Sequence, residues 1–124
     1  MLIELIAQYK DIISSWEVEK YELEGPDFRL KLKIFFVDGS ILHVRQVVFN
    51  GTTLKYAYHW QAKDGSLKMR WDNAQHWPDI STFPHHKHVA RDAHIVVLPS
   101  SGADLSVVME EIAMEIRSDD RTGI

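Results

Sequence analysis

Alternating hydrophobic and polar residues along the middle of the chain predict an antiparallel β-sheet. Residues 28–37 and 41–49 are rich in branched and aromatic side chains and are joined by Asp38-Gly39, a strong hairpin signal. Residues 53–61 and 67–71 repeat the pattern around Asp64-Gly65. Further strand-like runs are at 16–21 and 94–98. The runs between residues 16 and 71 therefore predict an antiparallel meander of four to five strands, which a loop and the short strand 94–98 follow.

Helical periodicity is confined to the two ends of the chain. Residues 2–10 are typical of a short helix, and residues 103–117 give the clearest helix, with Ser101 and Asp104 expected to form a capping box at its start. Its apolar stripe consists of Leu105, Val108, Met109, Ile112 and Ile116. We therefore expect one α+β domain spanning residues 1–124, with the C-terminal helix packed on the sheet and residues 118–124 frayed.

Side-chain positions can be predicted most closely in the hairpin of residues 53–61 and 67–71. If Asp64-Gly65 forms a two-residue turn, the facing pairs on the apolar side are Tyr58 with Trp71 and Trp60 with Met69. On the polar side His59 then faces Arg70, with Asp72 on the diagonal. The aromatic residues are expected in the core, whereas the three polar residues fit either an exposed salt cluster or part of a site.

The distribution of charge changes the picture that the net charge of −4 gives. Residues 1–27 carry seven acidic and two basic residues (−5), and residues 92–124 carry the same numbers (−5). Residues 28–91 carry ten basic and four acidic residues (+6), together with six of the seven histidines. An acidic chain can therefore present a basic, histidine-rich surface that suits an anionic partner such as a nucleic acid. Alternatively, the middle and the ends of the chain pair with each other in the fold.

Composition excludes several classes of protein. The chain contains no cysteine, so disulfides, zinc–cysteine sites and a thiol nucleophile are ruled out. It has no apolar run of membrane-spanning length and no basic, apolar leader at its start, which predicts a cytoplasmic protein without membrane contact.

Residues 76–94 contain five histidines and allow three interpretations. If residues 85–88 are extended, His86 and His88 share a face; if they are helical, His85 pairs with His88. With His76 or Asp72 these histidines would suit zinc or nickel. Without a metal, histidines can transfer protons while Arg or Lys stabilises phosphate oxygens. The third interpretation is a solvated loop.

Three segments resemble the TumE-type toxins of bacterial and archaeal toxin–antitoxin pairs. They are Tyr58-His59-Trp60-Gln61, Arg70-Trp71-Asp72-Asn73-Ala74 and Phe83-Pro84-His85-His86-Lys87-His88. The resemblance implies a small toxin that acts on RNA and is neutralised by a cognate DNA-binding antitoxin. Around His76 the chain departs from the family pattern of a proline and a second histidine, since Gln75 and Trp77 flank it. The order of elements is also similar to that of RelE-like and microbial ribonuclease folds, an analogy that shows no function.

We therefore expect a metal-independent endoribonuclease without a cofactor, zinc or nickel being the less favoured option. The expected catalytic residues are His59, Arg70, Asp72, His85, His86 and His88. The expected RNA-binding residues are Lys68, Arg70, Trp77, Lys87 and Arg91, with Trp77 stacking on a base. The alternatives are a non-catalytic module that binds nucleic acid or protein through the same face, and a metal-dependent hydrolase. The oligomeric state stays open, with a homodimer as one option.

Overall fold

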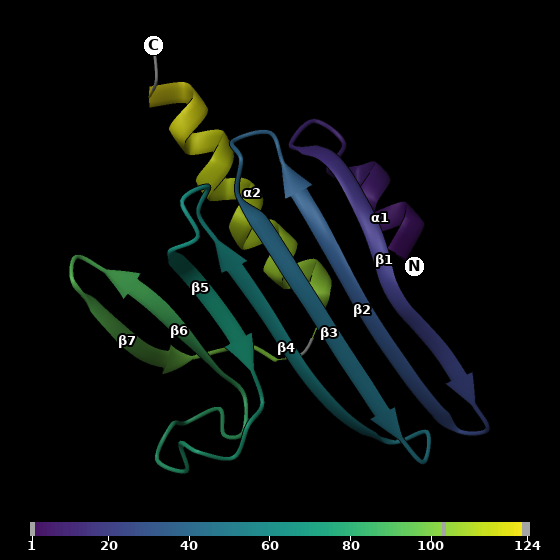
Figure 1. Ribbon diagram of the computed structural model, residues 1–124. Helices are drawn as coiled ribbons and strands as arrows, with labels where there is room; N and C mark the ends of the chain where they lie inside the picture. The colour runs from purple at the N-terminus through teal and green to yellow at the C-terminus, as the bar shows by residue number, and fades with distance from the viewer. Residues whose placement is uncertain (1, 103, 123–124) are drawn as a thin grey trace.

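The computed structural model describes residues 2–102 and 104–122, which form one seven-stranded antiparallel sheet with two helices. The strands follow one another in the sheet in chain order, as Figure 1 shows. The elements are α1 (Leu2–Gln8), β1 (Ile13–Glu24), β2 (Asp27–Phe36), β3 (Ile41–Phe49), β4 (Thr53–Gln61), β5 (Leu67–Asp72), β6 (His86–Arg91), β7 (His94–Pro99) and α2 (Leu105–Thr122).

This architecture corrects the expected fold class. The protein is mostly β, with seven strands rather than four to five. The difference arises at both ends of the sheet, where β1 runs for 12 residues and the histidine tract forms a sixth strand, β6, paired with β5 and β7. The likeness to RelE-like and microbial ribonuclease folds rested on the order of a helix followed by a meander of four to five strands and is not retained.

Two turns of the same sequence, Asp-Gly-Ser, connect β2 to β3 and β4 to β5. Each turn encloses a three-residue loop, residues 37–39 in the first and residues 63–65 in the second. The residues that flank each loop are hydrogen-bonded: the Phe36 N–H donates to the Ser40 carbonyl oxygen (2.9 Å), and the Ala62 N–H donates to the Ser66 carbonyl oxygen (2.8 Å). The glycines have φ of 87° and 90°, the left-handed geometry that ends such a loop. The prediction of a two-residue turn at Asp64-Gly65 is therefore wrong, since the loop also includes Lys63.

The predicted facing pairs of β4 and β5 are nevertheless confirmed. Tyr58 faces Trp71, Trp60 faces Met69 and His59 faces Arg70. The three-residue loop alone would shift this register by one residue, and a bulge beside Trp60 shifts it back. The apolar and polar faces of the hairpin therefore remain separate.

The hydrophobic core lies between one face of the sheet and the two helices. Its buried side chains from the sheet are Leu30, Leu32, Ile34, Phe36, Leu42, Val44, Tyr56, Tyr58, Trp60 and Trp71. The helix α2 contributes Leu105, Val108, Met109, Ile112, Ala113 and Ile116. In Figure 1 both helices lie behind the sheet, and no described element covers its front face. We call this front face the open face.

The beginning and end of α2 differ from the expectation. Asp104, rather than Ser101, caps the helix, because its Oδ1 accepts a hydrogen bond from the Ser106 N–H (2.9 Å). The helix continues to Thr122 and so includes most of the segment expected to be frayed, while residues 123–124 lie outside the described chain. Among the described residues, no helix is long and apolar enough to cross a membrane.

Candidate functional site

Strand pairing collects polar side chains into two neighbouring rows on the open face. Paired residues on adjacent antiparallel strands point to the same side of a sheet, so the register places them directly. One row contains Lys33, His43, His59, Arg70 and His88. The next row contains Lys31, Arg45, Ala57, Asp72 and His86. Residues distant in sequence thus meet at β5 and β6.

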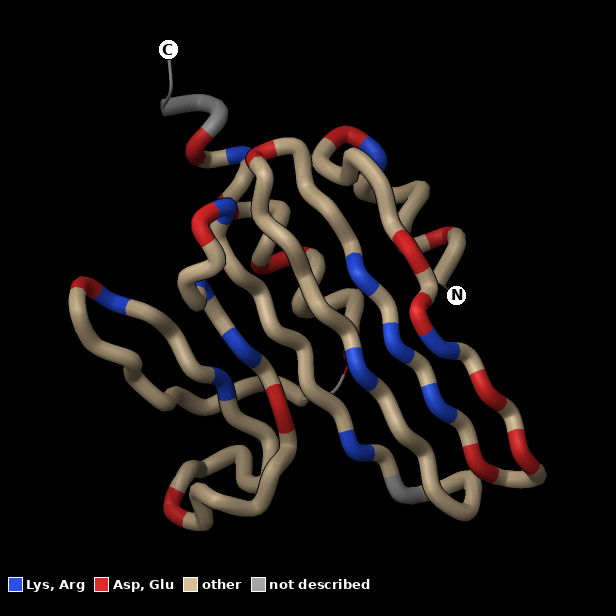
Figure 2. The backbone as a smooth tube through the Cα atoms, viewed as in Figure 1, with Lys and Arg blue, Asp and Glu red and all other residues tan. Residues whose placement is uncertain are grey.

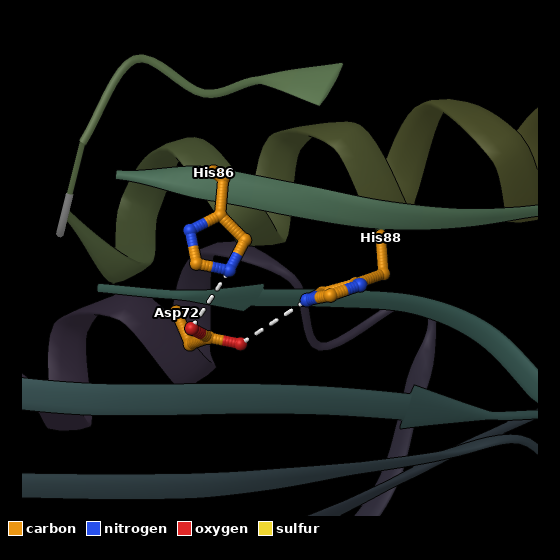
Figure 3. A group of neighbouring side chains, drawn as sticks. All are labelled: Asp72, His86 and His88. Carbon is orange, nitrogen blue, oxygen red and sulfur yellow. Dashed lines mark ion pairs between the residues drawn. The ribbon is translucent and has the colours of Figure 1, made fainter. Parts of the chain in front are cut away.

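Asp72 is the centre of the cluster. Its Oδ1 lies 2.9 Å from His86 Nε2 and accepts a hydrogen bond from the Ala74 N–H (3.0 Å). Its Oδ2 accepts from Arg70 Nε (3.2 Å) and lies 3.5 Å from His88 Nε2. Figure 3 shows the two histidines reaching Asp72 from the neighbouring strand. Because the carboxylate is buried, these groups replace the water that it would otherwise bind.

His86 is only 1% exposed, and both of its ring nitrogens face oxygen atoms. Nδ1 lies 3.0 Å from the Pro84 carbonyl oxygen, and Nε2 lies 2.9 Å from Asp72 Oδ1. An imidazole with one N–H can donate to only one of these acceptors, whereas the imidazolium form donates to both. His86 is therefore suited to holding Asp72 in place, with both of its ring nitrogens next to protein oxygens in this structure.

His88 and His59 flank Arg70 and are more accessible than His86. Desolvation lowers the pKa of His88, and the nearby His86 and Arg70 add to this effect, while Asp72 opposes it. Desolvation also lowers the pKa of His59, assisted by Arg70 and His43. Arg70 Nη1 lies 3.4 Å from His59 Nδ1. Both side chains therefore favour the neutral form, which can accept a proton.

The cluster lies at one end of a wide groove of about 1290 Å³ on the open face. Four basic residues from four strands line it, namely Arg29, Arg45, Lys55 and Arg70. Figure 2 shows that Lys and Arg positions are frequent along the central strands of the sheet. The loop after β5 adds Trp77, which is 42% exposed and whose ring centroid lies 6.3 Å from that of His88. Such a groove can hold a polyanion and an aromatic ring of the ligand.

Four of the residues expected in the site lie elsewhere. His85 accepts or donates a hydrogen bond with the Tyr56 hydroxyl (2.8 Å from Nδ1) and stacks on its ring. Lys87 and Lys68 point to the helix side of the sheet, where α2 supplies Glu111 and Glu115 at 3.2 Å and 3.4 Å. Arg91 is exposed at the end of β6, paired in register with His94, and does not line the groove.

The sequence interpretation omitted Arg29, Arg45 and Lys55, which supply most of the positive charge of the groove. The signal was available for Lys55, since it alternates with the apolar-face residues Leu54 and Tyr56 in the same way as His59 does with its neighbours. His43, which is not among the expected site residues, lies beside His59 with ring centroids 6.1 Å apart, and its Nε2 is 3.2 Å from Gln61 Oε1.

Asp72, His86 and His88 are also the described residues that could hold a metal ion. One ligand atom from each lies within 4.8 Å of the others. The hydrogen bond from His86 to a backbone carbonyl is typical of metal-bound histidine. The Arg70 guanidinium, 3.2 Å from the same carboxylate, would repel a cation there. The geometry thus permits a metal but also gives the carboxylate a full set of protein donors.

Comparison with known proteins identifies the family. The family model described as Toxin TumE matches residues 2–119, nearly the whole chain. No curated protein and no solved structure matches the chain. The TumE family comprises toxins of toxin–antitoxin systems, which implies an antitoxin partner. The resemblance seen in the three sequence segments is therefore confirmed, and the chain belongs to the TumE toxin family.

Proposed function

We propose that this toxin cleaves RNA without a metal, in the groove of the open face. The observation that carries the proposal is the contact of His88, Arg70 and His86 with one buried carboxylate, at the end of a groove lined by basic residues. Cleavage at a ribose needs a base for the 2′-hydroxyl proton, an acid for the leaving oxygen and cations for the phosphate oxygens.

His88 is the general base of the proposed reaction. With its Nε2 directed at Asp72 (3.5 Å), the N–H is on Nε2 and the lone pair is on Nδ1. The lowered pKa keeps this imidazole neutral and able to accept a proton. Nδ1 takes the 2′-hydroxyl proton, the 2′-oxygen attacks phosphorus, and the 5′-oxygen leaves with a proton from an acid. The products are a 2′,3′-cyclic phosphate and a 5′-hydroxyl end.

Arg70 binds the phosphate that reacts, and His59 supplies the proton to the leaving oxygen. The guanidinium lies between the two histidines, with Nη1 3.4 Å from His59 Nδ1 and Nε 3.2 Å from Asp72 Oδ2. A bound phosphate adds negative charge beside His59 and offsets the repulsion from Arg70 and His43 that lowers its pKa. Substrate binding therefore favours the imidazolium form of His59, which is the form that donates.

The other groove residues bind the RNA on either side of the cleaved bond. Arg45 and Lys55 are exposed and extend the positive surface across β3 and β4. Trp77 offers a ring for base stacking beside His88. Asp72 and His86 are positioning residues, since their polar atoms are engaged by protein partners and Asp72 contacts both His88 and Arg70. His85, Lys68, Lys87 and Arg91 take no part in this proposal.

The test is cleavage of end-labelled RNA by the purified toxin, with and without a chelator. We expect His88→Ala and Arg70→Ala each to slow cleavage by about 10²–10⁴-fold. Arg91→Ala is the matched control. Like Arg70→Ala it replaces one arginine with alanine, but Arg91 is on β6 outside the groove, so cleavage should be unchanged. RNA with 2′-O-methyl groups should resist cleavage, and the natural product should end in a 2′,3′-cyclic phosphate.

Other outcomes would point to the two alternative functions. Salt-dependent RNA binding without cleavage, weakened by Arg45→Ala but not by His88→Ala, would indicate a binding module and overturn the proposal. Cleavage that requires an added divalent metal, and is lost on Asp72→Asn and His86→Gln, would indicate a metal-dependent hydrolase. The latter is the second candidate function because Asp72, His86 and His88 converge within 4.8 Å.

A further inference from the structure

The edge strand β1 presents an apolar row that the helices leave uncovered. Trp16, Val18, Tyr21 and Leu23 face the helix side of the sheet, because they pair in register with core-side residues of β2. Nevertheless Tyr21 is 62% and Leu23 is 66% exposed. Figure 1 shows the β1–β2 end projecting beyond both α1 and α2. Exposed apolar rows of this length on a sheet edge are uncommon unless a partner covers them.

The row continues into a second hollow of about 590 Å³. Leu2 and Leu5 of α1, Phe28 and Leu30 of β2, and Leu105 at the start of α2 line it together with Tyr21. Its polar lining includes Glu4 and Asp104. This hollow is on the opposite side of the sheet from the groove and therefore does not belong to the proposed RNA site.

The opposite side of β1 is acidic. The strand contains Glu17, Glu19, Glu22 and Glu24 against the single base Lys20, and all of these residues are exposed. Some of this charge is met within the sheet, by Lys33 near Glu19 (3.8 Å) and by Lys20 near Glu22 (3.8 Å). The strand also lies at the end of the sheet order, with β2 as its one partner among the described strands. Its outer edge can therefore accept a further strand.

We propose that β1 binds an extended segment of the antitoxin, which adds to the sheet as an eighth strand. The segment alternates apolar residues, which extend the row of Tyr21 and Leu23 towards the hollow, with Lys or Arg residues, which face Glu17 and Glu22. Charge complementarity selects this partner over a second copy of the toxin. Two β1 strands side by side would bring eight glutamates together against two lysines.

The experiment measures binding of the antitoxin encoded beside the toxin gene to the purified full-length toxin. Leu23→Lys should weaken binding roughly tenfold or more, as should the double change Glu17→Lys with Glu22→Lys. Ile95→Lys is the matched control, since Ile95 is 60% exposed on β7, the other edge strand, and this variant should bind as the wild type does. In the wild-type complex the amides of residues 13–24 should be protected from hydrogen exchange.

Unchanged affinity of both Leu23→Lys and the Glu17→Lys, Glu22→Lys double variant, or no added protection in residues 13–24, would overturn the proposal. A toxin dimer in the absence of antitoxin that Leu23→Lys dissociates would also overturn it and identify a second copy as the occupant. The exchange measurement uses the wild-type protein and so remains decisive if a variant fails to fold. The inference rests on the family's antitoxin partner and not on RNA cleavage, which is assayed separately.

Discussion

Replacing Asp72 with Asn would remove the charge at the centre of the site with little change in size. The carboxylate oxygens are approached by Ala74 N–H and His86 at Oδ1 and by Arg70 and His88 at Oδ2. An asparagine replaces one of these acceptors with an NH₂ donor. If the NH₂ takes the place of Oδ1, it faces the Ala74 N–H, and if it takes the place of Oδ2, it faces the Arg70 Nε–H. In both cases two donors face each other without an acceptor. Neither orientation of the amide can satisfy the surrounding donors.

The size of the effect follows from these contacts. A hydrogen bond to a charged group contributes about 1.5–3 kcal/mol. Removing one member of a buried ion pair costs about 3–5 kcal/mol when the other charge stays buried. The Arg70 side chain is 39% exposed and can turn towards water, so the lower part of this range applies. We expect Asp72→Asn to lower the free energy of unfolding by about 2–4 kcal/mol.

The measurement is urea unfolding at about pH 7.5, followed by the fluorescence of the four tryptophans. Asp64→Asn is the control, because Asp64 also accepts from a backbone N–H and a hydroxyl, both of Ser66, but in an exposed turn. It should lose much less stability. A loss at Asp72 no larger than at Asp64 would refute the argument that this carboxylate holds the cluster together.

Three other predictions concern protonation, the helix side of the sheet and the turns. The lowered pKa values of His59 and His88 mean that the unfolded chain binds protons more readily, so the free energy of unfolding should fall as the pH drops below about 6.5. Urea unfolding across this range tests it, and replacing both histidines with Gln should flatten the dependence. Lys87→Met should leave RNA cleavage unchanged and cost at most about 1 kcal/mol in urea unfolding, because its partner is a glutamate on α2; slower cleavage would contradict this. Gly39→Ala and Gly65→Ala should each cost about 1–2 kcal/mol, since both have φ near 90°. Gly39→Ala should lower the free energy of unfolding only slightly more than Gly65→Ala does. An added Cβ at Gly39 would meet an atom of the flexible Lys63 side chain at 2.8 Å, whereas nothing lies within 4 Å of one at Gly65.

The sequence predicted the sheet residues around the site better than it predicted the extent of the sheet. The alternation of Tyr58 and His59 separated the two faces correctly, and the pair of His59 with Arg70 is confirmed. This pairing is correct although the predicted turn was one residue too short, because the bulge beside Trp60 shifts the register back by one residue. A bulge of this kind has no local sequence signal that could have been used. Only residues 16–21 of β1 were predicted as a strand, whereas the strand runs from Ile13 to Glu24, with nearly all of its residues exposed.

The histidine tract could not be resolved from sequence because its secondary structure was ambiguous. In the strand β6, His86 and His88 share a face, while Lys87 points to the other. Tertiary contacts decide between the two forms, since β6 is held between β5 and β7. Glu111 then neutralises Lys87 from an element 24 residues away in the chain, a contact that no short-range pattern could reveal. A basic residue next to a site in sequence is therefore not necessarily part of that site.

The positions of β1 and the groove limit how the antitoxin could neutralise the toxin. β1 is at one end of the sheet, whereas His88 is on β6, five strands along the order. At about 4.8 Å between strands, this separation is roughly 24 Å. A strand added to β1 would therefore bind the toxin without reaching the cluster around Asp72. Blocking RNA requires a further part of the antitoxin to cross the open face, where the basic residues of the groove would attract acidic side chains. An antitoxin that binds both surfaces would combine a basic segment for β1 with an acidic segment for the groove. The contact at β1 would then supply binding affinity, and the contact at the groove would block RNA.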